Sequence, residues 1–327
     1  MSKGQVIVLG VTGHLGRVVA EAFVAAGWTV TGMARHDRHK IPGVRFVAGN
    51  SDSVADMRRA IGDIDLVVNT LNLPYAAWDK GRMEAQMGRV LEALGTSGKT
   101  MLFPANIYNF NQTNRVMTPG LVQKPQTPRG AIRVQVEGMF RDAALRGDIQ
   151  TIILRAGDFF GPHSVADWFD QAMMRDVAKG RVVTMGTKGV GHAWAYLPDL
   201  ARAFESLGAM RRTLGAFEDF HFAGHFVTPE QMAAAISRTA PRPVSISSFP
   251  LILLKVFGLF DPVMREVSKM DYQWRHPMEL KDSRLDKLLG REFGTPFEAA
   301  VRATIAPFFA SSRKIGTGME RTAESRV

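Results

Sequence analysis

Cysteine is absent from the 327 residues of this sequence, and its absence excludes whole classes of protein. Without thiols the chain can form neither a disulfide framework nor a zinc or iron–sulfur site with cysteine ligands. Disorder as the main state is excluded too, because 46% of the residues are hydrophobic and 22% are charged, as in globular proteins. We therefore expect a folded protein of a reducing cytoplasm.

Long hydrophobic runs are also missing. The longest, residues 249–260 (FPLILLKVFGLF), is interrupted by Lys255 and is far shorter than the roughly 20 residues that span a bilayer. We expect a buried or interfacial helix there and no transmembrane segment. The N-terminal apolar run breaks at Gly10 and lacks the length and cleavage region of a signal peptide, which favours a cytoplasmic location.

Concentrated positive charge is a third absence. Lys and Arg number 41 against 31 Asp and Glu, a formal charge of +10, so acidic or phosphorylated partners must be considered. The charge is scattered, however, and no basic block or aromatic ladder resembles a nucleic-acid arm, so we expect no nucleic-acid partner. We expect no metal site either, because His221 and His225 lie in a predicted strand and turn, where their rings diverge.

What the sequence does contain is a regular alternation of strand and helix signals. Residues 5–9 (QVIVL) form the near-continuous apolar run of a strand covered on both faces, and residues 18–26 have helical spacing that ends at Gly27. Further strands are predicted over residues 28–34, 44–48, 65–69, 100–103 and 151–154, and further helices over residues 54–61, 82–94 and 132–146. Repeated βα units of this length predict an α/β fold with a doubly wound parallel sheet, the Rossmann fold.

The alternation loosens after Gly161. Helices are predicted over residues 166–179, 198–207 and 229–239, and strands over residues 181–185 and 220–223. We expect a Rossmann domain over residues 1–160 and a smaller, mixed C-terminal cap over residues 161–310, with some segments returning to the Rossmann core. Residues 311–327 are polar and aperiodic, and we expect this tail to be disordered.

A glycine-rich loop, GVTGHLG at residues 10–16, joins the first predicted strand to the first helix. In that context the first glycine permits a tight turn, the second lets the backbone approach a pyrophosphate, and the third lets the helix pack on the strand. The loop therefore predicts a dinucleotide site, with a purely structural turn as the alternative. Its expected cofactor contacts are Gly10, Thr12, Gly13, His14, Leu15 and Gly16.

The end of the second strand favours NADP(H) over NAD(H). Arg35 stands where an NAD-selective site usually carries an acidic residue for the ribose hydroxyls, and a guanidinium suits a 2′-phosphate instead. Arg38 and Lys40 add positive charge nearby. The alternative is a solvated basic loop.

The glycine-rich loop and the basic strand end resemble the extended short-chain dehydrogenase/reductase superfamily, in particular its NAD-dependent epimerase/dehydratase group. Three later segments are similar to the same family: residues 49–52 (GNSD) to its adenine loop, residues 154–162 (LRAGDFFGP) to its LRPxxxYGP strand end, and residues 194–201 (WAYLPDLA) to a later helix start. The resemblance implies a homodimer formed through the helices at residues 82–94 and 132–146. It also implies further cofactor contacts from Asn50, Ser51, Leu71 and Asn72.

The proton relay of that family is replaced in this chain. Family members use a Tyr-x-x-x-Lys pair on the long helix and a serine after the fifth strand. If Glu137 marks the acidic residue four positions beyond the lysine, Arg129 and Arg133 occupy the tyrosine and lysine positions. Pro104 and Ala105 replace the serines. Arg133 can still hydrogen-bond ribose hydroxyls, but a guanidinium does not release its proton near neutral pH.

Any catalysis must therefore use another proton donor. Tyr108 is a candidate because it follows the carboxyl end of the fifth strand, where open α/β sheets bind ligands. A tyrosine packed under the cap is the alternative, and Tyr75 and Tyr196 are weaker candidates.

Asp158 bears on the choice of substrate. Its carboxylate would repel a substrate diphosphate, so we expect a small neutral or cationic substrate rather than a nucleotide sugar. The alternative is a structural carboxylate that caps backbone amides or pairs with Arg155. The expected catalytic residues are thus Tyr108, Arg133 and Asp158.

Two functions remain open. One is an NADP(H)-binding oxidoreductase or epimerase-like enzyme with a non-standard active site. The other is a non-catalytic, NADP-sensing regulator of the NmrA kind, which also keeps the glycine loop and lacks the Tyr-Lys pair. The missing relay favours the sensor. An organised cap that carries Asp158 favours the enzyme, which we prefer; His192 and Trp194 could line its substrate pocket, although core packing is the commoner role.

Overall fold

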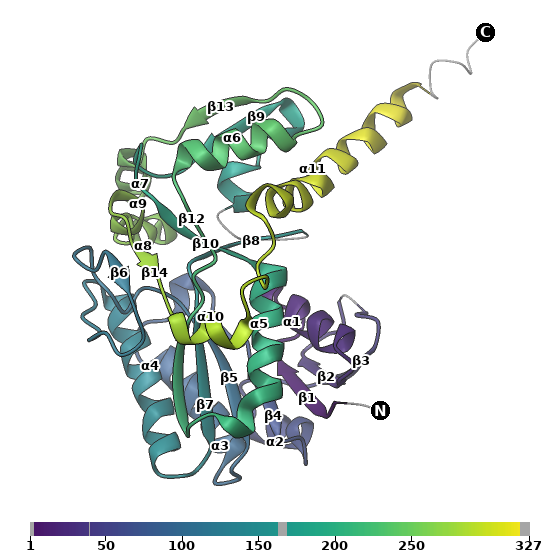
Figure 1. Cartoon of the computed structure of the whole chain (residues 1–327), viewed down its shortest axis with the longest axis vertical. Coiled ribbons are helices and arrows are strands. Elements are labelled where there is room, and N and C mark those ends of the chain that lie inside the picture. The colour runs from purple at the N-terminus through teal and green to yellow at the C-terminus, as the bar shows by residue number, and fades with distance from the viewer. Residues whose placement is uncertain (1–2, 39, 163–168, 321–327) are drawn as a thin grey trace.

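A seven-stranded sheet runs through the centre of the molecule (Figure 1). The computed structural model describes residues 3–38, 40–162 and 169–320. The strands follow the order β11-β7-β5-β4-β1-β2-β3, and every neighbouring pair is parallel, which confirms the predicted doubly wound sheet. Their bounds are Gln5–Leu9 (β1), Thr29–Ala34 (β2), Val44–Ala48 (β3), Leu66–Asn69 (β4), Thr100–Ala105 (β5), Gln150–Arg155 (β7) and Phe217–His221 (β11).

Helices cover both faces of this sheet. One face carries α1 (His14–Ala25) and α5 (Leu197–Met210), and the other carries α2 (Val54–Ile61), α3 (Arg82–Leu94) and α4 (Pro128–Leu145). Successive side chains of a strand point to opposite faces, so Val6 and Val8 are buried in the first layer and Ile7 and Leu9 in the second. A strand covered on both sides is therefore apolar at its buried positions, as β1 is from Val6 to Leu9.

The apolar side chains of α3 are buried against the sheet. They are Met83, Met87, Val90 and Leu94. A homodimer would therefore have to use the more polar outer faces of α3 and α4.

The strand order reverses at β1. From β1 the chain runs outward through β2 and β3, and it returns to the other side of β1 at β4. The loops that leave the carboxyl ends of β1 and β4 therefore diverge, and ligands bind in the crevice that such loops leave. The glycine-rich loop follows β1, and residues 70–72 follow β4.

A buried cluster of charges joins α4 to the sheet. Arg155, the last residue of β7, is fully buried and forms ion pairs with Glu137 of α4 at 2.7 Å and with Asp219 of β11 at 3.3 Å. Its guanidinium also donates a hydrogen bond of 2.6 Å to the carbonyl oxygen of Asn106, in the loop after β5. Arg155 is thus engaged away from Asp158, and the alternative in which these two residues pair is not realised.

The later half of the chain builds a smaller cap, which lies above the central sheet in Figure 1. Its apolar core is enclosed by two small sheets and by α6 and α11, which pack against each other. The elements are β8 (Asp158–Phe160), β9 (Arg181–Thr184), β10 (His192–Tyr196), β12 (His225–Val227), α6 (Pro229–Thr239), β13 (Ser245–Ser248) and α11 (Phe297–Glu320). Three later elements, α5, β11 and α10 (Ser283–Leu289), lie instead with the central sheet, where Leu285 of α10 is buried.

One cap prediction needs correction. The segment predicted as a helix over residues 166–179 contains, in its described part, a π-helical turn η2 (Phe169–Met173) and a 3₁₀ turn η3 (Val177–Lys179). The wide turn is closed by a 3.0 Å hydrogen bond from the Met174 N–H to the Phe169 carbonyl, and both side chains enter the cap core. Residues 163–168 lie outside the described part of the chain.

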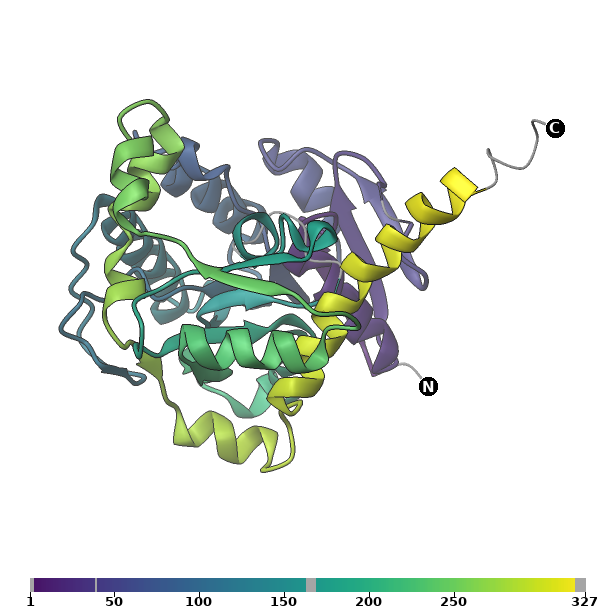
Figure 2. The ribbon, with the colours of Figure 1, turned by 90° about the horizontal axis from the view of Figure 1, so that it is seen from above.

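The C-terminal tail contains the end of the last helix. Helix α11 continues over residues 311–320, where the sequence predicts disorder, and residues 321–327 lie outside the described part. Both views show α11 leaving the body of the molecule (Figures 1 and 2). The helix is nucleated by buried residues near its start, such as Val301 and Ile305, and extending an existing helix is far easier than starting one.

Short elements complete the chain. They are η1 (Tyr75–Ala77), β6 (Val116–Met117), η4 (Arg211–Thr213), α7 (Ile252–Phe257), α8 (Pro262–Ser268), α9 (Tyr272–Arg275) and β14 (Glu279–Leu280), which pairs with β6. Across residues 3–38, 40–162 and 169–320, no helix combines the length and the apolar character needed to cross a membrane.

Candidate functional site

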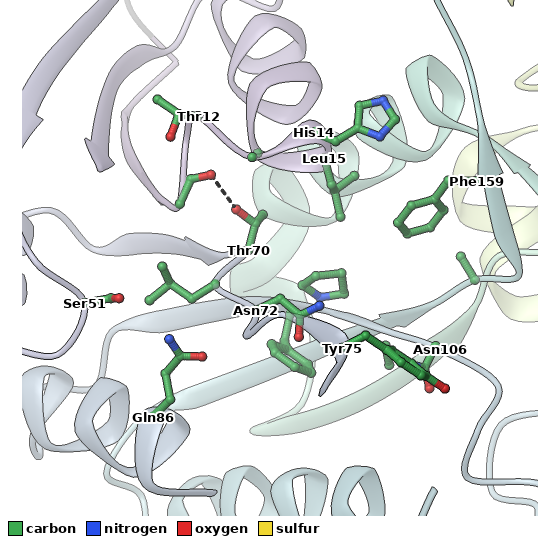
Figure 3. Close-up of a pocket in the computed structure, with 18 of the residues that line it drawn as sticks. Thr12, His14, Leu15, Ser51, Thr70, Asn72, Tyr75, Gln86, Asn106 and Phe159 are labelled. Carbon is green, nitrogen blue, oxygen red and sulfur yellow. Dashed lines mark hydrogen bonds between the residues drawn. The ribbon is translucent and has the colours of Figure 1, made fainter. Parts of the chain in front are cut away.

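A cavity of about 630 Å³ opens at the crevice between β1 and β4. Its lining comes from the loops after β1 to β5, from α4 and from the start of the cap. Figure 3 shows Ser51 and Gln86 toward one end, Asn106 and Phe159 toward the other, and the glycine-rich loop above them. The volume is within the roughly 300–1,000 Å³ typical of small-molecule and cofactor sites, and the elongated arrangement suits a ligand of two linked parts.

The glycine-rich loop forms one wall of this cavity. Gly10 has a φ of +82°, in the left-handed region that favours glycine, and α1 begins directly after Gly13, which has no side chain to cap it. The first backbone N–H groups of α1 therefore border the cavity uncapped, which is the arrangement that binds phosphate. At Gly16 a Cβ atom would collide with the Gly10 carbonyl oxygen and lie 2.7 Å from Thr70 Oγ1, so only glycine lets α1 approach the loop this closely.

We expect Gly16→Ala to lower the free energy of unfolding by about 1–3 kcal/mol and to weaken dinucleotide binding, because the methyl group must displace Gly10 or Thr70. Gly138→Ala in α4 is the matched control, since a Cβ there meets nothing within 4 Å. Urea unfolding and calorimetry with NADP(H) measure the two effects. Equal stability and affinity in both variants would contradict the required close approach.

Almost all cofactor residues predicted from the sequence lie at this cavity. Those that line it are Gly10, Thr12, Gly13, His14, Leu15, Gly16, Arg35, Ser51, Leu71, Asn72 and Arg133. Asn50 is outside the lining. Its side-chain oxygen accepts a hydrogen bond from the Asp52 N–H at 3.0 Å, and its own N–H donates to Asp56 at 2.9 Å. Asn50 thus shapes the turn that presents Ser51.

A basic edge borders the cavity at the end of β2. Arg35, His36 and Arg38 all contribute to the lining, and Arg35 is exposed. Among the residues that the structure describes, Arg35 has no ion-pair partner. Its guanidinium is therefore available to a phosphate group.

Arg133 reaches the cavity from α4. Its side chain is buried, its guanidinium carbon lies 4.3 Å from the ring centre of Trp78, and one Nη donates to Asn72 Oδ1 at 3.5 Å. Its Nε has no hydrogen-bond partner among the described residues. Burial lowers the pKa of Arg133 to about 10, so near neutral pH it remains a cation that can bind and orient a ligand but does not act as an acid.

Two tyrosines also border the cavity. Tyr108, after β5, and Tyr75, in η1, flank Trp78 with ring-centre distances of 6.4 and 5.6 Å. Burial raises the pKa of Tyr108 well above its usual value and also raises the pKa of Tyr75. Both phenols are therefore neutral near pH 7 and can donate a hydrogen bond to a ligand, unlike the tyrosinate of a Tyr-Lys relay.

Asp158 and His192 form a pair at the cap side of the cavity. Asp158 lines the cavity, and its Oδ2 lies 2.8 Å from Nε2 of the buried His192. The other ring nitrogen, Nδ1, lies 3.2 Å from the carbonyl oxygen of Gln273, which only accepts hydrogen bonds, so Nδ1 carries a proton. Nε2 and the Asp158 carboxyl group face each other across 2.8 Å, which brings two groups that can exchange a proton together beside the cavity.

Arg129 lies behind the same wall. It is buried, its guanidinium carbon lies 4.2 Å from the ring centre of Tyr75, and its Nε lies 3.4 Å from Glu266 of α8. Arg129 therefore supports the tyrosine-bearing turn η1.

The cavity also contains residues that the sequence did not predict, and the weaker candidates lie in different places. Trp78, Gln86 and Gln273 line the cavity but were not predicted. Gln86 carries a buried Oε1 without a hydrogen-bond partner among the described residues, whereas Gln273 lies so far along the chain that no sequence signal links it to the glycine-rich loop. Of the weaker candidates, Tyr75 does border the cavity, Trp194 is buried in the cap core, and Tyr196 borders a separate, smaller cavity.

Comparison with known proteins gives a family and a set of similar folds. The sequence model of the NAD dependent epimerase/dehydratase family matches residues 6–220. No curated protein matches the sequence. MoeE5 in complex with UDP-glucose and NAD has a TM-score of 0.72 and 17% identity, over 94% of this chain and 99% of that chain.

Two further solved structures have the same fold. UDP-glucose 4-epimerase from Brucella ovis in complex with NAD has a TM-score of 0.71 and 16% identity, over 94% of this chain and 98% of that chain. The Bordetella bronchiseptica enzyme WbmH in complex with NAD+ has a TM-score of 0.68 and 18% identity, over 94% of this chain and 99% of that chain.

Proposed function

The chain belongs to the NAD-dependent epimerase/dehydratase family, as its motifs predicted, and we propose that it is an NADP(H)-binding oxidoreductase or epimerase-like enzyme that acts on a small molecule. The observation that carries this proposal is the convergence of three features on one cavity: the glycine-rich loop, the buried cation of Arg133 and the Asp158–His192 pair. If the glycine-rich loop were only a structural turn, it would not need Asp158 and His192 at the same cavity.

The residues present fit a dinucleotide. The uncapped start of α1 would hold the pyrophosphate, Arg35 the 2′-phosphate, and Arg133 with Asn72 the ribose next to the nicotinamide. When bound, the dinucleotide supplies or accepts a hydride. Two buried polar atoms that lack partners among the described residues, Arg133 Nε and Gln86 Oε1, would gain hydrogen bonds from such a ligand.

We expect NADP(H) to bind at least about tenfold more tightly than NAD(H), because a charge-assisted hydrogen bond contributes roughly 1.5–3 kcal/mol. Arg35→Ala should remove that preference. Arg238→Ala is the control for net charge, since Arg238 pairs with Glu298 and lies outside the cavity lining. Calorimetry with both cofactors measures the ratio, and equal affinities in the unmodified protein would overturn the assignment of Arg35.

Asp158 and His192 take the place of the missing tyrosine in this proposal. The pair gives a proton to a substrate carbonyl oxygen as that carbonyl becomes an alcohol, and in the reverse direction it takes the proton back. Arg133 orients the same oxygen and stabilises the negative charge that develops on it. Tyr75 and Tyr108, which stay neutral, donate hydrogen bonds and exclude water.

The substrate in this proposal is a neutral or cationic small molecule rather than a nucleotide sugar. Asp158 lines the cavity, and once the proton has left the Asp158–His192 pair its carboxylate repels a nearby diphosphate. A panel of neutral and cationic carbonyl compounds tests the function directly, with NADPH deuterated at the transferable position. Deuterium in a product establishes hydride transfer.

A non-catalytic, NADP-sensing role is the second candidate. It is favoured by Arg129, which stands at the family's tyrosine position and is held between Tyr75 and Glu266 rather than facing a substrate. A sensor would bind NADPH and become more resistant to proteolysis, yet transfer no deuterium to any compound. The homodimer and the cytoplasmic setting expected from the sequence belong to the same proposal in either case.

A further inference from the structure

The segment from Ile252 to Val263 carries an unusual concentration of exposed apolar side chains. It comprises α7, a turn at Gly258 and the start of α8, and we refer to it, with the rest of α8, as the α7–α8 hairpin. Of the eleven large hydrophobic side chains that are exposed among the described residues, six lie here: Ile252, Val256, Phe257, Leu259, Phe260 and Val263. Clusters of this kind mark surfaces that bind a partner or a membrane.

The hairpin also has an inner face that is fully accounted for. Leu251, Leu254 and Val267 are buried in a cluster with Trp274. The outer side chains are therefore not left over from poor packing, because the same two helices already bury a complete apolar side. Because the hairpin is apolar on both sides, its outer side needs an apolar partner outside this chain.

The exposure increases toward the tip. Phe257 is 47% exposed, Leu259 70% and Phe260 84%. A Cβ at Gly258 would lie 2.9 Å from the backbone of Arg265, so the two helices cross closely and the turn between them is tight. Figure 2 shows this green hairpin projecting from the body of the molecule. The acyl chains of a lipid bilayer can surround a narrow, convex apolar tip on all sides, whereas a flat protein surface can contact only part of it.

The charge near the tip complements an anionic surface. Lys255, Arg265 and, directly after α8, Lys269 are exposed, and they outnumber the carboxylates of Asp261 and Glu266 in a chain with a formal charge of +10. Lys269 pairs with Glu266 at 2.6 Å, and Asp261 caps α8 by accepting a hydrogen bond from the Val263 N–H at 2.7 Å. Basic side chains around an inserted apolar segment add electrostatic attraction to anionic lipids.

We propose that the α7–α8 hairpin docks the protein on the surface of an anionic phospholipid bilayer, with Leu259 and Phe260 inserted among the lipid chains. The binding is peripheral, because the apolar segment is short and its helices lie side by side. This inference stands apart from the proposed catalysis, since it rests on the outer surface of the hairpin alone.

Docking at this hairpin would bring the cavity close to the membrane. Glu266 of α8 pairs with Arg129, which in turn stacks on the cavity residue Tyr75. The inner apolar cluster of the hairpin also packs against Tyr75. A substrate that is itself amphiphilic could then pass between membrane and cavity over a short distance.

Co-sedimentation with vesicles tests the proposal, using phosphatidylcholine alone and an equimolar mixture with phosphatidylglycerol. The tip variant Leu259→Ser/Phe260→Ser should bind the mixed vesicles at least about tenfold more weakly than the unmodified protein, because two inserted side chains are lost. Val122→Ser/Leu145→Ser is the matched control, since those side chains are 67% and 73% exposed elsewhere on the surface. It should bind like the unmodified protein.

Three further readouts make the result decisive. Calorimetry with NADP(H) should give the same affinity for all three proteins, which separates failure of docking from failure of the cofactor site. Added salt should weaken binding to the mixed vesicles, because it screens the basic side chains. The proposal is overturned if the unmodified protein does not bind mixed vesicles, if the tip variant binds them equally well, or if light scattering finds a dimer that only the tip variant loses.

Discussion

Glu137→Ala should lower the free energy of unfolding by about 3–5 kcal/mol. The substitution destabilises the fold because it removes the closest counter-ion of Arg155. That guanidinium is fully buried, and Glu137 is its closest carboxylate at 2.7 Å. Without Glu137 the cation keeps one carboxylate partner, Asp219 at 3.3 Å, and removing one member of a buried ion cluster costs far more than removing an exposed pair.

Two further variants sharpen this test in urea unfolding. Glu298→Ala removes an ion pair of 2.7 Å with Arg238, but both side chains are at least half exposed, so its effect should stay below about 1 kcal/mol. Glu137→Gln keeps hydrogen-bond acceptor and shape while removing the charge, and it should fall between the other two. If Glu137→Ala is no more destabilising than Glu298→Ala, the buried cluster does not stabilise the fold as argued.

The same cluster connects stability to the site. Arg155 donates to the carbonyl oxygen of Asn106 at 2.6 Å, and the Asn106 side chain accepts a hydrogen bond from the Tyr108 N–H at 3.1 Å. A change in the position of Arg155 would therefore also move the loop that carries Tyr108. A buried ion cluster at the end of β7 thus fixes the floor of the cavity as well as the packing of α4.

The central sheet could be predicted from the sequence because the patterns that indicate its strands and helices are local. The apolar run of β1 reflects burial on both faces, and the predicted bounds of β3, α2, α3 and α6 coincide with those observed. The glycine-rich loop was readable for the same reason, since the strand, the turn and the helix start follow one another directly. Most of the predicted cofactor contacts accordingly lie on the cavity.

The cap and the Asp158–His192 pair were harder to predict because they depend on contacts between segments that are distant in the sequence. The two-residue strands β6 and β14 pair across about half of the chain length, which no local pattern reveals. Asp158 was recognised as unusual, but its partner His192 was weighed as a pocket residue or a core residue, and Gln273, which orients the ring, was not predicted. Spacing along the sequence carries no information about such pairs.

Asp158→Asn should lower turnover by about 10²–10⁴-fold while leaving the affinity for NADP(H) nearly unchanged. An asparagine keeps the size of the side chain and can still hydrogen-bond His192 Nε2, but it can neither hold nor release the shared proton. Cofactor affinity should survive because the glycine-rich loop and Arg35 are untouched. Deuterium transfer from labelled NADPH to the active carbonyl compound measures turnover, and calorimetry measures affinity.

His192→Gln and Tyr108→Phe distinguish the pair from the competing donor. If His192 shares the proton with Asp158, His192→Gln should lower turnover to a similar degree. Tyr108→Phe should lower turnover by about 10²-fold if the phenol is the donor, and should change it little if the pair is. A large loss in Tyr108→Phe together with full turnover in Asp158→Asn would assign proton transfer to the tyrosine, because the two variants remove the only proton that each donor could supply.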